Sequence, residues 1–555
     1  MVGGMKDVVI VGSGAGGAPL ALKLSQAGFD VLVLEKGPRY ERSDYRHDEV
    51  HEAVKGGGFV PSVREEPHVL VDDTQPGLAP RLTTIGWTAC CVGGGTAHMG
   101  GALFRFHPDD FRVVSRFGAY HENADWPYGY EELERYYCEA ESLIGVSGSG
   151  RANPFEGFRS RSYPMGPLES HPVTPWFDAA CRKLGLSPFP TPRAINSRPY
   201  GGRPACSFCD FCAGFGCPTG ARGSTQETLL PWAERTGRCE IRAESMVREI
   251  TVDRNGRATG CVYIDKSGTE HRVSASLVCV CSSAVESARL LLMSRSPQFP
   301  AGLANGSGLV GRHLQFHAGS TGRARFRYDR RLDKPLHDRH PFLERSVMDH
   351  YFLPDGVAPF PKGGLHRFGI STIRPIRVAR YVAFNGPDGA VWGTKLKERL
   401  REYVAEARGL DFEVFHDFVP NRNTFVDLDP QVKDKWGLPV ARIHMTEPEH
   451  HRVAGRWLVD RGLEILDAMG ADEIIAGSAG YTNGVMAHGT CRAGTDPSTS
   501  VLNEYCRAHE VPNLFVVDGS FMPTSGGAPS TLTIIANSLR TADYVVARAR
   551  RGDLM

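Results

Sequence analysis

Residues 8–28 read VVIVGSGAGGAPLALKLSQAG. Four consecutive β-forming residues, Val8 to Val11, lead directly into a glycine-rich turn, and the apolar spacing that follows is typical of a helix ending near Gly28. A second run of β-formers, VLVL, occupies residues 31–34. This order of strand, turn, helix and strand predicts an α/β fold with a Rossmann-like domain.

The glycines of this turn have the spacing of a dinucleotide-binding site. Gly12 makes the turn, Gly14 lets the backbone approach the pyrophosphate, and Gly17 allows the helix to pack closely on the strand. Glu35 ends the second strand and is expected to bind the adenosine ribose. The helix N-terminus adds a positive dipole for the phosphates. The motif occurs once, so we expect one nucleotide cofactor, and it does not distinguish NAD from FAD.

The composition of the 555-residue chain narrows the class of protein. Hydrophobic residues make up 41% and charged residues 23%, which is ordinary for a globular protein with a large core. The net charge of +1 gives no reason to expect nucleic acid or an anionic membrane as a partner. We see no apolar run long enough to span a membrane and no secretory signal, so we expect a cytoplasmic protein whose 14 cysteines are reduced thiols or metal ligands.

A second ligand-facing helix is predicted near the C-terminus. The apolar run at 511–517 is typical of a buried strand and ends at Asp518 and Gly519. After a loop rich in glycine and proline, Ser530 and Thr531 are typical N-terminal residues for the helix that follows. The N-terminus of such a helix can stabilise negative charge on a phosphate or a cofactor ring.

Several separated segments of the chain resemble the glucose-methanol-choline (GMC) oxidoreductases, a family of FAD enzymes. They occur in the family's order and span most of the sequence. The resembling segments are 12–17 with Glu35, 92–101 with Gly94, Gly95, Thr96 and His98, then 126–127, 283–291, 307–312, 488–492 and 518–519. The resemblance implies that these glycines, Thr96, Asp518, Gly519, Ser530 and Thr531 contact FAD.

The resemblance also implies the domain organisation. A Rossmann-like FAD-binding domain is expected from residues 1–160, 220–317 and 481–555, with a connecting segment at 161–219. Residues 318–480 are expected to form an inserted α+β substrate domain built on an antiparallel sheet. Within it, Thr394 is expected to cap a helix whose apolar stripe is formed by Leu396, Leu400, Val404 and Ala407.

Oxidation of an alcohol requires a base for the hydroxyl proton, and histidine suits this task near neutral pH. In the family, this histidine stands three residues before a Gly-Thr pair, a position that is Met486 here. The nearest histidine is His488, which projects to the same face as Met486 if the segment is extended. We therefore predict that His488 is the base, with a structural histidine beside the cofactor as the alternative.

Two further positions depart from the family or leave alternatives open. The family's second catalytic residue, a His or Asn, falls on Pro529, which is neither a hydrogen-bond donor nor a base. Either another residue such as Asn483 or Asn537 replaces it, or His488 acts alone. His98 stands where some relatives attach the flavin covalently; the alternative is a loop histidine packed under the ring.

Four cysteines crowd into twelve residues as Cys206-x2-Cys209-x2-Cys212-x4-Cys217. This is close to the spacing of a bacterial ferredoxin run, with one extra residue before the last cysteine. The region also resembles related bacterial sugar dehydrogenases in which a cysteine cluster holds iron and sulfur. An iron–sulfur cluster, a zinc ion and four unliganded thiols all fit the pattern. An iron–sulfur cluster would be able to accept electrons from a reduced flavin and pass them on.

Taken with the resemblance, the sequence predicts FAD-dependent oxidation of a CH–OH group in a small polyhydroxylated substrate of the sugar or aminoglycoside type. A primary alcohol is the expected reacting group. Acidic residues that could bind an amine are Glu413, Asp417 and Glu447. Three kinds of electron acceptor remain open: oxygen, a quinone and a protein. The alternatives are a flavin electron-transfer protein without alcohol oxidation and a non-redox lyase of the same fold.

Overall fold

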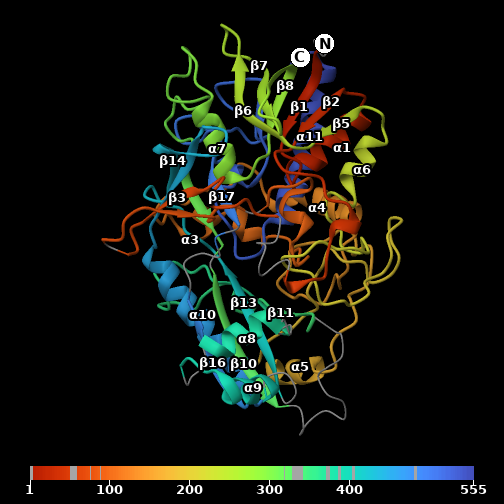
Figure 1. The fold of residues 1–555 in the computed structure, drawn as a ribbon, viewed down its shortest axis with the longest axis vertical. Coiled ribbons are helices and arrows are strands. Elements are labelled where there is room, and N and C mark those ends of the chain that lie inside the picture. Colours follow the sequence, from red (N-terminus) through yellow and green to blue (C-terminus); the bar gives the residue numbers. More distant parts are fainter. Residues whose placement is uncertain are drawn as a thin grey trace.

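A computed structural model describes most of the chain. The described residues are 4–50, 59–75, 77–87, 89–317, 319–327, 342–370, 375–384, 389–402, 407–479, 484 and 486–554. Within them the protein has two lobes, a nucleotide-binding lobe and a second lobe built on an antiparallel sheet (Figure 1).

The nucleotide-binding lobe is centred on a seven-stranded sheet. Its strands are β5 (Cys239–Arg242), β2 (Val31–Leu34), β1 (Lys6–Val11), β8 (Glu270–Val280), β7 (Ala258–Asp265) and β6 (Ser245–Val252), in that order, with β18 (Leu514–Val516) beside β8. The central strand β1 pairs in parallel with both β2 and β8, as a Rossmann-like sheet requires. Strand β18 also pairs in parallel with β8, so two segments far apart in sequence complete one sheet.

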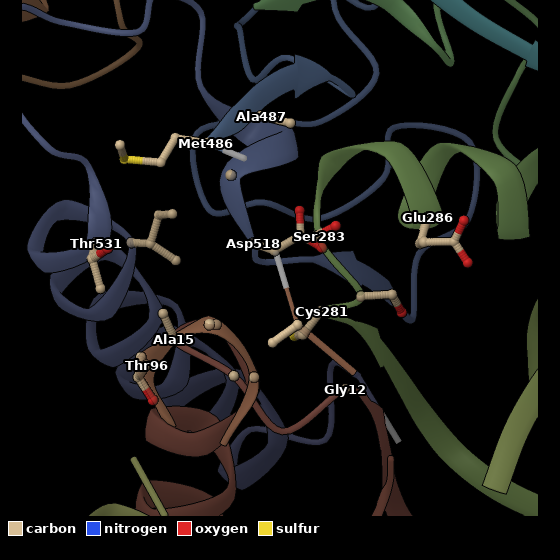
Figure 2. A pocket seen from close by; sticks show the side chains of 18 of the residues that line it. Gly12, Ala15, Thr96, Cys281, Ser283, Glu286, Met486, Ala487, Asp518 and Thr531 are labelled. Atoms are coloured by element: carbon tan, nitrogen blue, oxygen red, sulfur yellow. The ribbon is translucent and has the colours of Figure 1, made fainter. Parts of the chain in front are cut away.

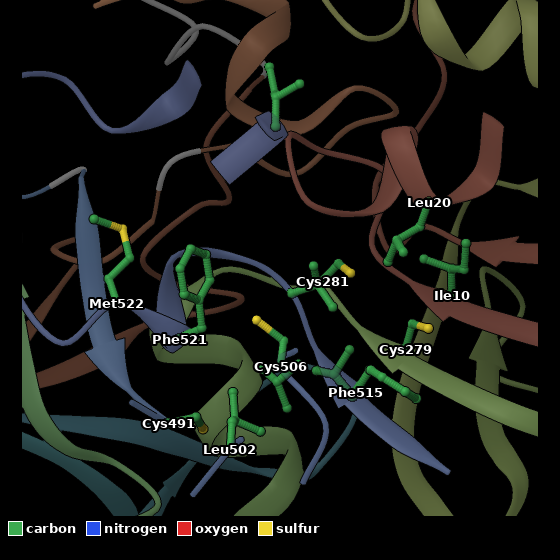
Figure 3. Packing of buried hydrophobic residues seen from close by; sticks show 14 of the residues in the cluster. Ile10, Leu20, Cys279, Cys281, Cys491, Leu502, Cys506, Phe515, Phe521 and Met522 are labelled. Atoms are coloured by element: carbon green, nitrogen blue, oxygen red, sulfur yellow. The ribbon is translucent and has the colours of Figure 1, made fainter. Parts of the chain in front are cut away.

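The central strands are buried because helices cover the sheet. Strand β2 is buried throughout, which explains its uninterrupted VLVL sequence. Helix α11 (Thr531–Arg550) packs against α1 (Gly17–Gln26) and α4 (Tyr130–Ile144). Figure 3 shows the resulting core, in which Cys279, Cys281 and Cys506 lie as small apolar side chains beside Phe515. All 14 cysteines are free thiols.

The second lobe contains a five-stranded sheet, which agrees with the predicted antiparallel substrate domain. Its order is β11 (Arg345–Val347), β12 (Gly364–Ile370), β13 (Ala407–His416), β10 (Ser320–Arg327) and β16 (Glu473–Ser478), and all its pairings are antiparallel. Helices α10 (Glu449–Ala468) and α5 (Thr174–Lys183) contribute to the apolar core on one side of this sheet. The proposed boundaries at 318 and 480 remain a prediction.

Two smaller sheets connect the lobes. Strands β14 (Phe425–Lys433) and β15 (Pro439–Met445) lie within the proposed substrate segment, but they join β3 (His68–Asp72) and β4 (Arg81–Thr83) instead of the five-stranded sheet. Strand β9 (Arg312–Phe316) pairs with β17 (Ala487–Thr490). This last pair carries His488 and therefore positions the predicted catalytic residue.

The remaining helices are short. They are α3 (Val113–Phe117), α6 (Leu229–Glu234), α7 (Ala284–Met293), α8 (Pro375–Phe384) and α9 (Gly393–Arg401), with 3₁₀ turns at Arg42–Asp44, Gly94–Ala97, Pro108–Phe111 and Gly519–Phe521. Within the described part of the chain, no helix combines the length and the apolar character needed to cross a bilayer.

Candidate active site

A cavity of about 570 Å³ extends from the glycine-rich turn to the second lobe. Its volume lies in the usual range for small-molecule and cofactor sites. It is lined by these predicted site residues: Gly12, Gly14, Glu35, Gly94, Gly95, Thr96, His98, His488, Asp518, Gly519, Ser530 and Thr531. Figure 2 shows the glycine turn, Thr96, Met486, Asp518 and Thr531 around this space. Of the predicted catalytic and cofactor-binding residues, Gly17 alone is not part of this wall, so the structure brings almost all of them to one cavity.

The glycines of the turn serve two different purposes. A Cβ at Gly12 would lie 2.3 Å from the Cys281 carbonyl oxygen, and one at Gly17 would lie 1.9 Å from the carbonyl oxygen of Gly12. Both distances are far below van der Waals contact, so the protein's own packing requires these glycines. A Cβ at Gly14 would be 3.7 Å from the nearest protein atom, the Gly94 Cα, so no neighbouring protein atom excludes a side chain there. Gly14 lines the cavity, which fits the predicted approach of a dinucleotide pyrophosphate.

Replacing Gly14 and Gly17 by alanine should separate these two roles. Gly14→Ala is expected to melt like the parent but to bind FAD at least about tenfold more weakly, because the methyl group occupies space needed by the pyrophosphate. Gly17→Ala is expected to destabilise the fold itself. Thermal unfolding of the cofactor-free proteins and titration with FAD measure both effects. Equal FAD affinity in Gly14→Ala and the parent would contradict this role.

Glu35 lies buried at the end of β2, where the motif predicted it. Its carboxylate accepts hydrogen bonds from the Ser13 backbone N–H at 3.1 Å, the Ser13 hydroxyl at 2.7 Å and the Gly37 N–H at 3.0 Å. Burial nevertheless raises the pKa of Glu35. A carboxylate has about four acceptor positions, so Glu35 can also accept a ribose hydroxyl.

A charged cluster next to Glu35 was not found from the sequence. The Lys36 Nζ lies 2.7 Å from a Glu66 oxygen, 3.6 Å from a Glu286 oxygen and 3.7 Å from the centre of the Trp87 ring. Although burial alone would raise the pKa of Glu286, Arg289 and Lys36 lower it, so its carboxylate is charged. These residues come from the segment after β2, from α7 and from separate loops, so no local motif connects them.

His488 lies at the other end of the cavity, on β17. The register opposite Gln315 of β9 fixes its position, and both His488 and Met486 line the cavity, as the alternation predicted. The His488 Nε2 is 2.6 Å from the Ser530 Oγ, and the ring centre is 4.9 Å from that of His317. Burial, and then His317, hold the pKa of His488 well below its ordinary value, so the ring is neutral and able to accept a proton.

Ser530 is the polar group beside the base, although the sequence had suggested it only as a cofactor contact. It precedes α11, directly after Pro529, which also lines the cavity. Asn537 does not replace the family's second catalytic residue, because it is buried in the core with Tyr128 and Cys506. Asn483 lies outside the described residues.

The loop at 94–98 forms part of the cavity wall. Thr96 donates to the Gly93 carbonyl at 2.6 Å and lies 3.0 Å from the Thr225 hydroxyl, which fixes the turn. The His98 ring lines the cavity and stacks on Phe59 with centres 5.0 Å apart and planes at 16°. Asp518 also lines the cavity, but its carboxylate accepts hydrogen bonds from Ser287 and Ser520, so it holds the backbone here.

The four clustered cysteines do not line the cavity. The Cys206 Sγ accepts a hydrogen bond from the Phe208 N–H at 3.4 Å, and the Cys217 Sγ lies 3.4 Å from the Thr219 hydroxyl. Burial raises the pKa of Cys206 to about 11 and that of Cys212 to about 12, so both thiols are protonated at neutral pH. In the described ranges, no three His, Cys, Asp or Glu side chains converge as metal ligands.

Arg222 orders the cysteine-containing loop. Its guanidinium donates to the carbonyls of Cys212 at 2.8 Å and Phe215 at 2.7 Å, and to the Met99 carbonyl at 2.9 Å and the Ala97 carbonyl. The loop is thereby attached to the cavity wall at 97–99. A single buried arginine thus cross-links this loop to the cavity wall.

The second lobe contributes a smaller group of residues to the cavity. Arg367 of β12 and Glu413 and Phe415 of β13 lie on its wall. Of the predicted acidic residues, Glu413 therefore reaches the site. Asp417 is instead buried and accepts a hydrogen bond from the Ser525 hydroxyl at 2.8 Å, and Glu447 is not part of the wall.

Comparison with known proteins finds matches along most of the chain. Models described as GMC oxidoreductase match residues 50–319 and 420–538, and one described as an NAD(P)-binding Rossmann-like domain matches 10–68. The 2-methyl-1,2-propanediol dehydrogenase of Mycolicibacterium austroafricanum is 34% identical over 98% of this chain and 95% of its own. Paromamine 6'-oxidase of Streptomyces fradiae is 33% identical over 99% and 92%. The structure of Aspergillus oryzae formate oxidase, at 14% identity, covers 100% of both chains with a TM-score of 0.66, which shows a shared fold.

Proposed function

Because this chain belongs to the GMC oxidoreductase family, we propose that it uses FAD to oxidise a CH–OH group of a sugar or aminoglycoside-type substrate to the carbonyl, with a primary alcohol as the reacting group. Its relatives are oxidases and dehydrogenases of CH–OH donors, which favours this activity over electron transfer alone or a lyase reaction. The observation that carries the proposal is a neutral, buried His488 on the cavity wall, hydrogen-bonded to Ser530.

The cavity residues fit FAD at its nucleotide end. Gly14 leaves room for the pyrophosphate, Glu35 accepts the ribose, and the loop at 94–98 forms part of the wall. When bound, FAD supplies the acceptor for the hydride that leaves the substrate carbon. The N-terminus of α11 faces the cavity without a side-chain cap, so its backbone N–H groups favour negative charge there.

His488 would take the other product of the oxidation, the hydroxyl proton. The neutral ring has one unprotonated nitrogen, and we assign proton acceptance to Nε2. Ser530 can donate to Nε2 before the reaction and, after a rotation of its hydroxyl, accept from the protonated ring. Met486 shares the wall but cannot take a proton, which is why the base moves two residues along the strand.

Anaerobic mixing tests the proposed function. The protein loaded with FAD is combined with primary alcohols, diols, sugars and amino sugars, and the visible absorbance of the flavin is followed. Bleaching by hydroxylated donors, with formation of the aldehyde or ketone, is the expected result. A flavin that no donor bleaches, or turnover without any change in its absorbance, would contradict the proposal.

The pH dependence of the reaction follows from the lowered pKa of His488. A base works only when deprotonated, so lowering its pKa extends activity toward acid. We expect kcat/KM to stay level on the acid side down to about pH 6, below the ordinary histidine pKa of about 6.5. If kcat/KM instead falls toward acid with its midpoint at the ordinary histidine pKa, the catalytic base is a solvated group.

The electron acceptor and the cysteine cluster form separate proposals. An iron–sulfur cluster held by Cys206, Cys209, Cys212 and Cys217 would provide an exit to a quinone or protein acceptor. Because the thiols do not converge, we favour an acceptor that reaches the cavity directly, such as oxygen. Iron and acid-labile sulfide analysis of anaerobically purified protein tests the cluster.

A cytoplasmic location also stays part of the proposal, since many free cysteines suit a reducing compartment.

A further inference from the structure

The five-stranded sheet of the second lobe has two unlike faces. Along β13, Leu410, Phe412 and Val414 are buried and belong to the apolar core with helix α10. The alternate residues Asp411 and Glu413 point to the opposite face, because side chains alternate along a strand. This second face carries charged residues at Asp411 and Glu413, and it meets the cavity at Glu413 and Phe415.

Charged side chains on this second face form cross-strand pairs. Arg367 of β12 stands directly opposite Glu413 in the antiparallel register, and the two side chains form an ion pair. The next pair on this face joins Asp411 to Arg323 of β10, at 3.4 Å. Of these four residues, Arg367 and Glu413 line the cavity, and the other two do not.

The Arg367–Glu413 pair can bind further ligands. The Arg367 side chain is 22% exposed and that of Glu413 is 38% exposed, so neither is sealed by the protein. A guanidinium has five N–H donors and a carboxylate about four acceptor positions, which is more than one ion pair uses. Among the described residues, they are the charged side chains that this sheet adds to the cavity wall.

We infer that Arg367 and Glu413 form a specificity-determining pair that binds a second hydroxyl group of the substrate. This inference rests on the proposed alcohol oxidation. A hydroxyl both donates and accepts, so it can donate to Glu413 while it accepts from Arg367. Because the two charges cancel, the pair favours a neutral polyol. An ammonium group would have to displace Arg367 from Glu413 and leave the guanidinium near a like charge.

The first test compares two substrates in the FAD-loaded protein. Propane-1,2-diol carries a second hydroxyl next to the reacting group, and propan-1-ol lacks it. In Glu413→Gln we expect kcat/KM for the diol to fall by about tenfold to hundredfold through KM, the size of a hydrogen bond to a charged group. The value for propan-1-ol should stay within about twofold. Asp411→Asn is the matched control, with the same strand and face but no contact with the cavity.

The second test reverses the charge preference. Arg367→Met removes the cation that pairs with the Glu413 carboxylate. The ratio of kcat/KM for 2-aminopropan-1-ol to kcat/KM for propane-1,2-diol should therefore rise about tenfold. Equal losses for both alcohols in Glu413→Gln, the same loss in Asp411→Asn, or unchanged amine selectivity in Arg367→Met would overturn the inference. Failure of the proposed function is distinguishable, because then no alcohol bleaches the flavin of the parent protein.

Discussion

Replacing His488 by asparagine is expected to lower kcat/KM for alcohol oxidation by about 10² to 10⁴, the usual contribution of a general base. Asparagine keeps the ring's approximate size and its hydrogen bond to Ser530 but cannot take the hydroxyl proton. FAD should still bind, because the predicted nucleotide contacts lie at the other end of the cavity. Stopped-flow bleaching of the flavin under anaerobic conditions measures the rate of this step directly.

Two control variants refine this result. Met486→Leu changes a neighbouring residue of the cavity wall without removing a proton acceptor, so its rate should stay within a few-fold of the parent. Ser530→Ala removes the partner of Nε2 and should cost about tenfold, the effect of one hydrogen bond. A rate in His488→Asn equal to that in Met486→Leu would assign the base to another residue.

Acid is expected to destabilise the protein strongly between about pH 6.5 and 5, the range in which ordinary histidines gain a proton. The cause is a group of histidines that are buried and whose pKa values burial lowers: His317, His366, His416, His451 and His488. The pKa falls to about 4 in His317 and to about 3 in His366 and His451.

The sign of the effect follows from proton binding. Below about pH 6.5 the unfolded chain protonates these rings and the folded chain does not, so stability is full above that pH and is lost as the pH falls. Each ring removes at most about 1.4 kcal/mol per pH unit, and five together remove on the order of 10 kcal/mol by pH 5. Folded proteins are stable by only about 5–15 kcal/mol, so the loss is large.

Thermal unfolding followed between neutral pH and pH 5 measures this loss. His451→Phe provides the internal check, because it replaces one of the buried histidines by a phenyl ring that can keep the aromatic contact with Phe418. The number of protons taken up on unfolding, read from the slope of stability against pH, should fall by about one. His271→Gln is the matched surface control, since that ring is 40% exposed. A melting temperature that does not change from neutral pH to pH 5 would show that the histidines are solvated.

Local sequence patterns predicted the parts of the site that depend on neighbouring residues. The glycine turn and Glu35 belong to one strand–helix–strand unit, so their spacing fixes their geometry. His488 could be predicted because alternation along a strand places it on the same face as Met486. The helix predicted to run from Leu396 to Ala407 was wrong at its end, because α9 stops at Arg401 and Ala407 begins β13. Val404, the remaining residue of the predicted stripe, lies outside the described residues.

Contacts between distant elements could not be predicted in the same way. Ser530 reaches His488 only because the loop before α11 folds against β17, and Glu413 meets Arg367 only through the register of two antiparallel strands. The cysteine run is a case in which spacing leaves alternatives open. Its spacing suits a metal centre, but spacing alone does not bring sulfur atoms together, and among the described residues Arg222 orders the loop.

The pairing of β18 with β8 has a consequence for biosynthesis. A ribosome releases β1, β2 and β8 long before β18 and α11, so the nascent sheet carries an open edge for more than 200 residues of further synthesis. Cofactor capture must then wait until translation is almost complete. A premature stop just upstream of residue 514 would yield a chain that has most of its β-strands but lacks β18 and α11, and we expect it not to bind FAD. Its unpaired sheet edge would make it a substrate for chaperones or proteases.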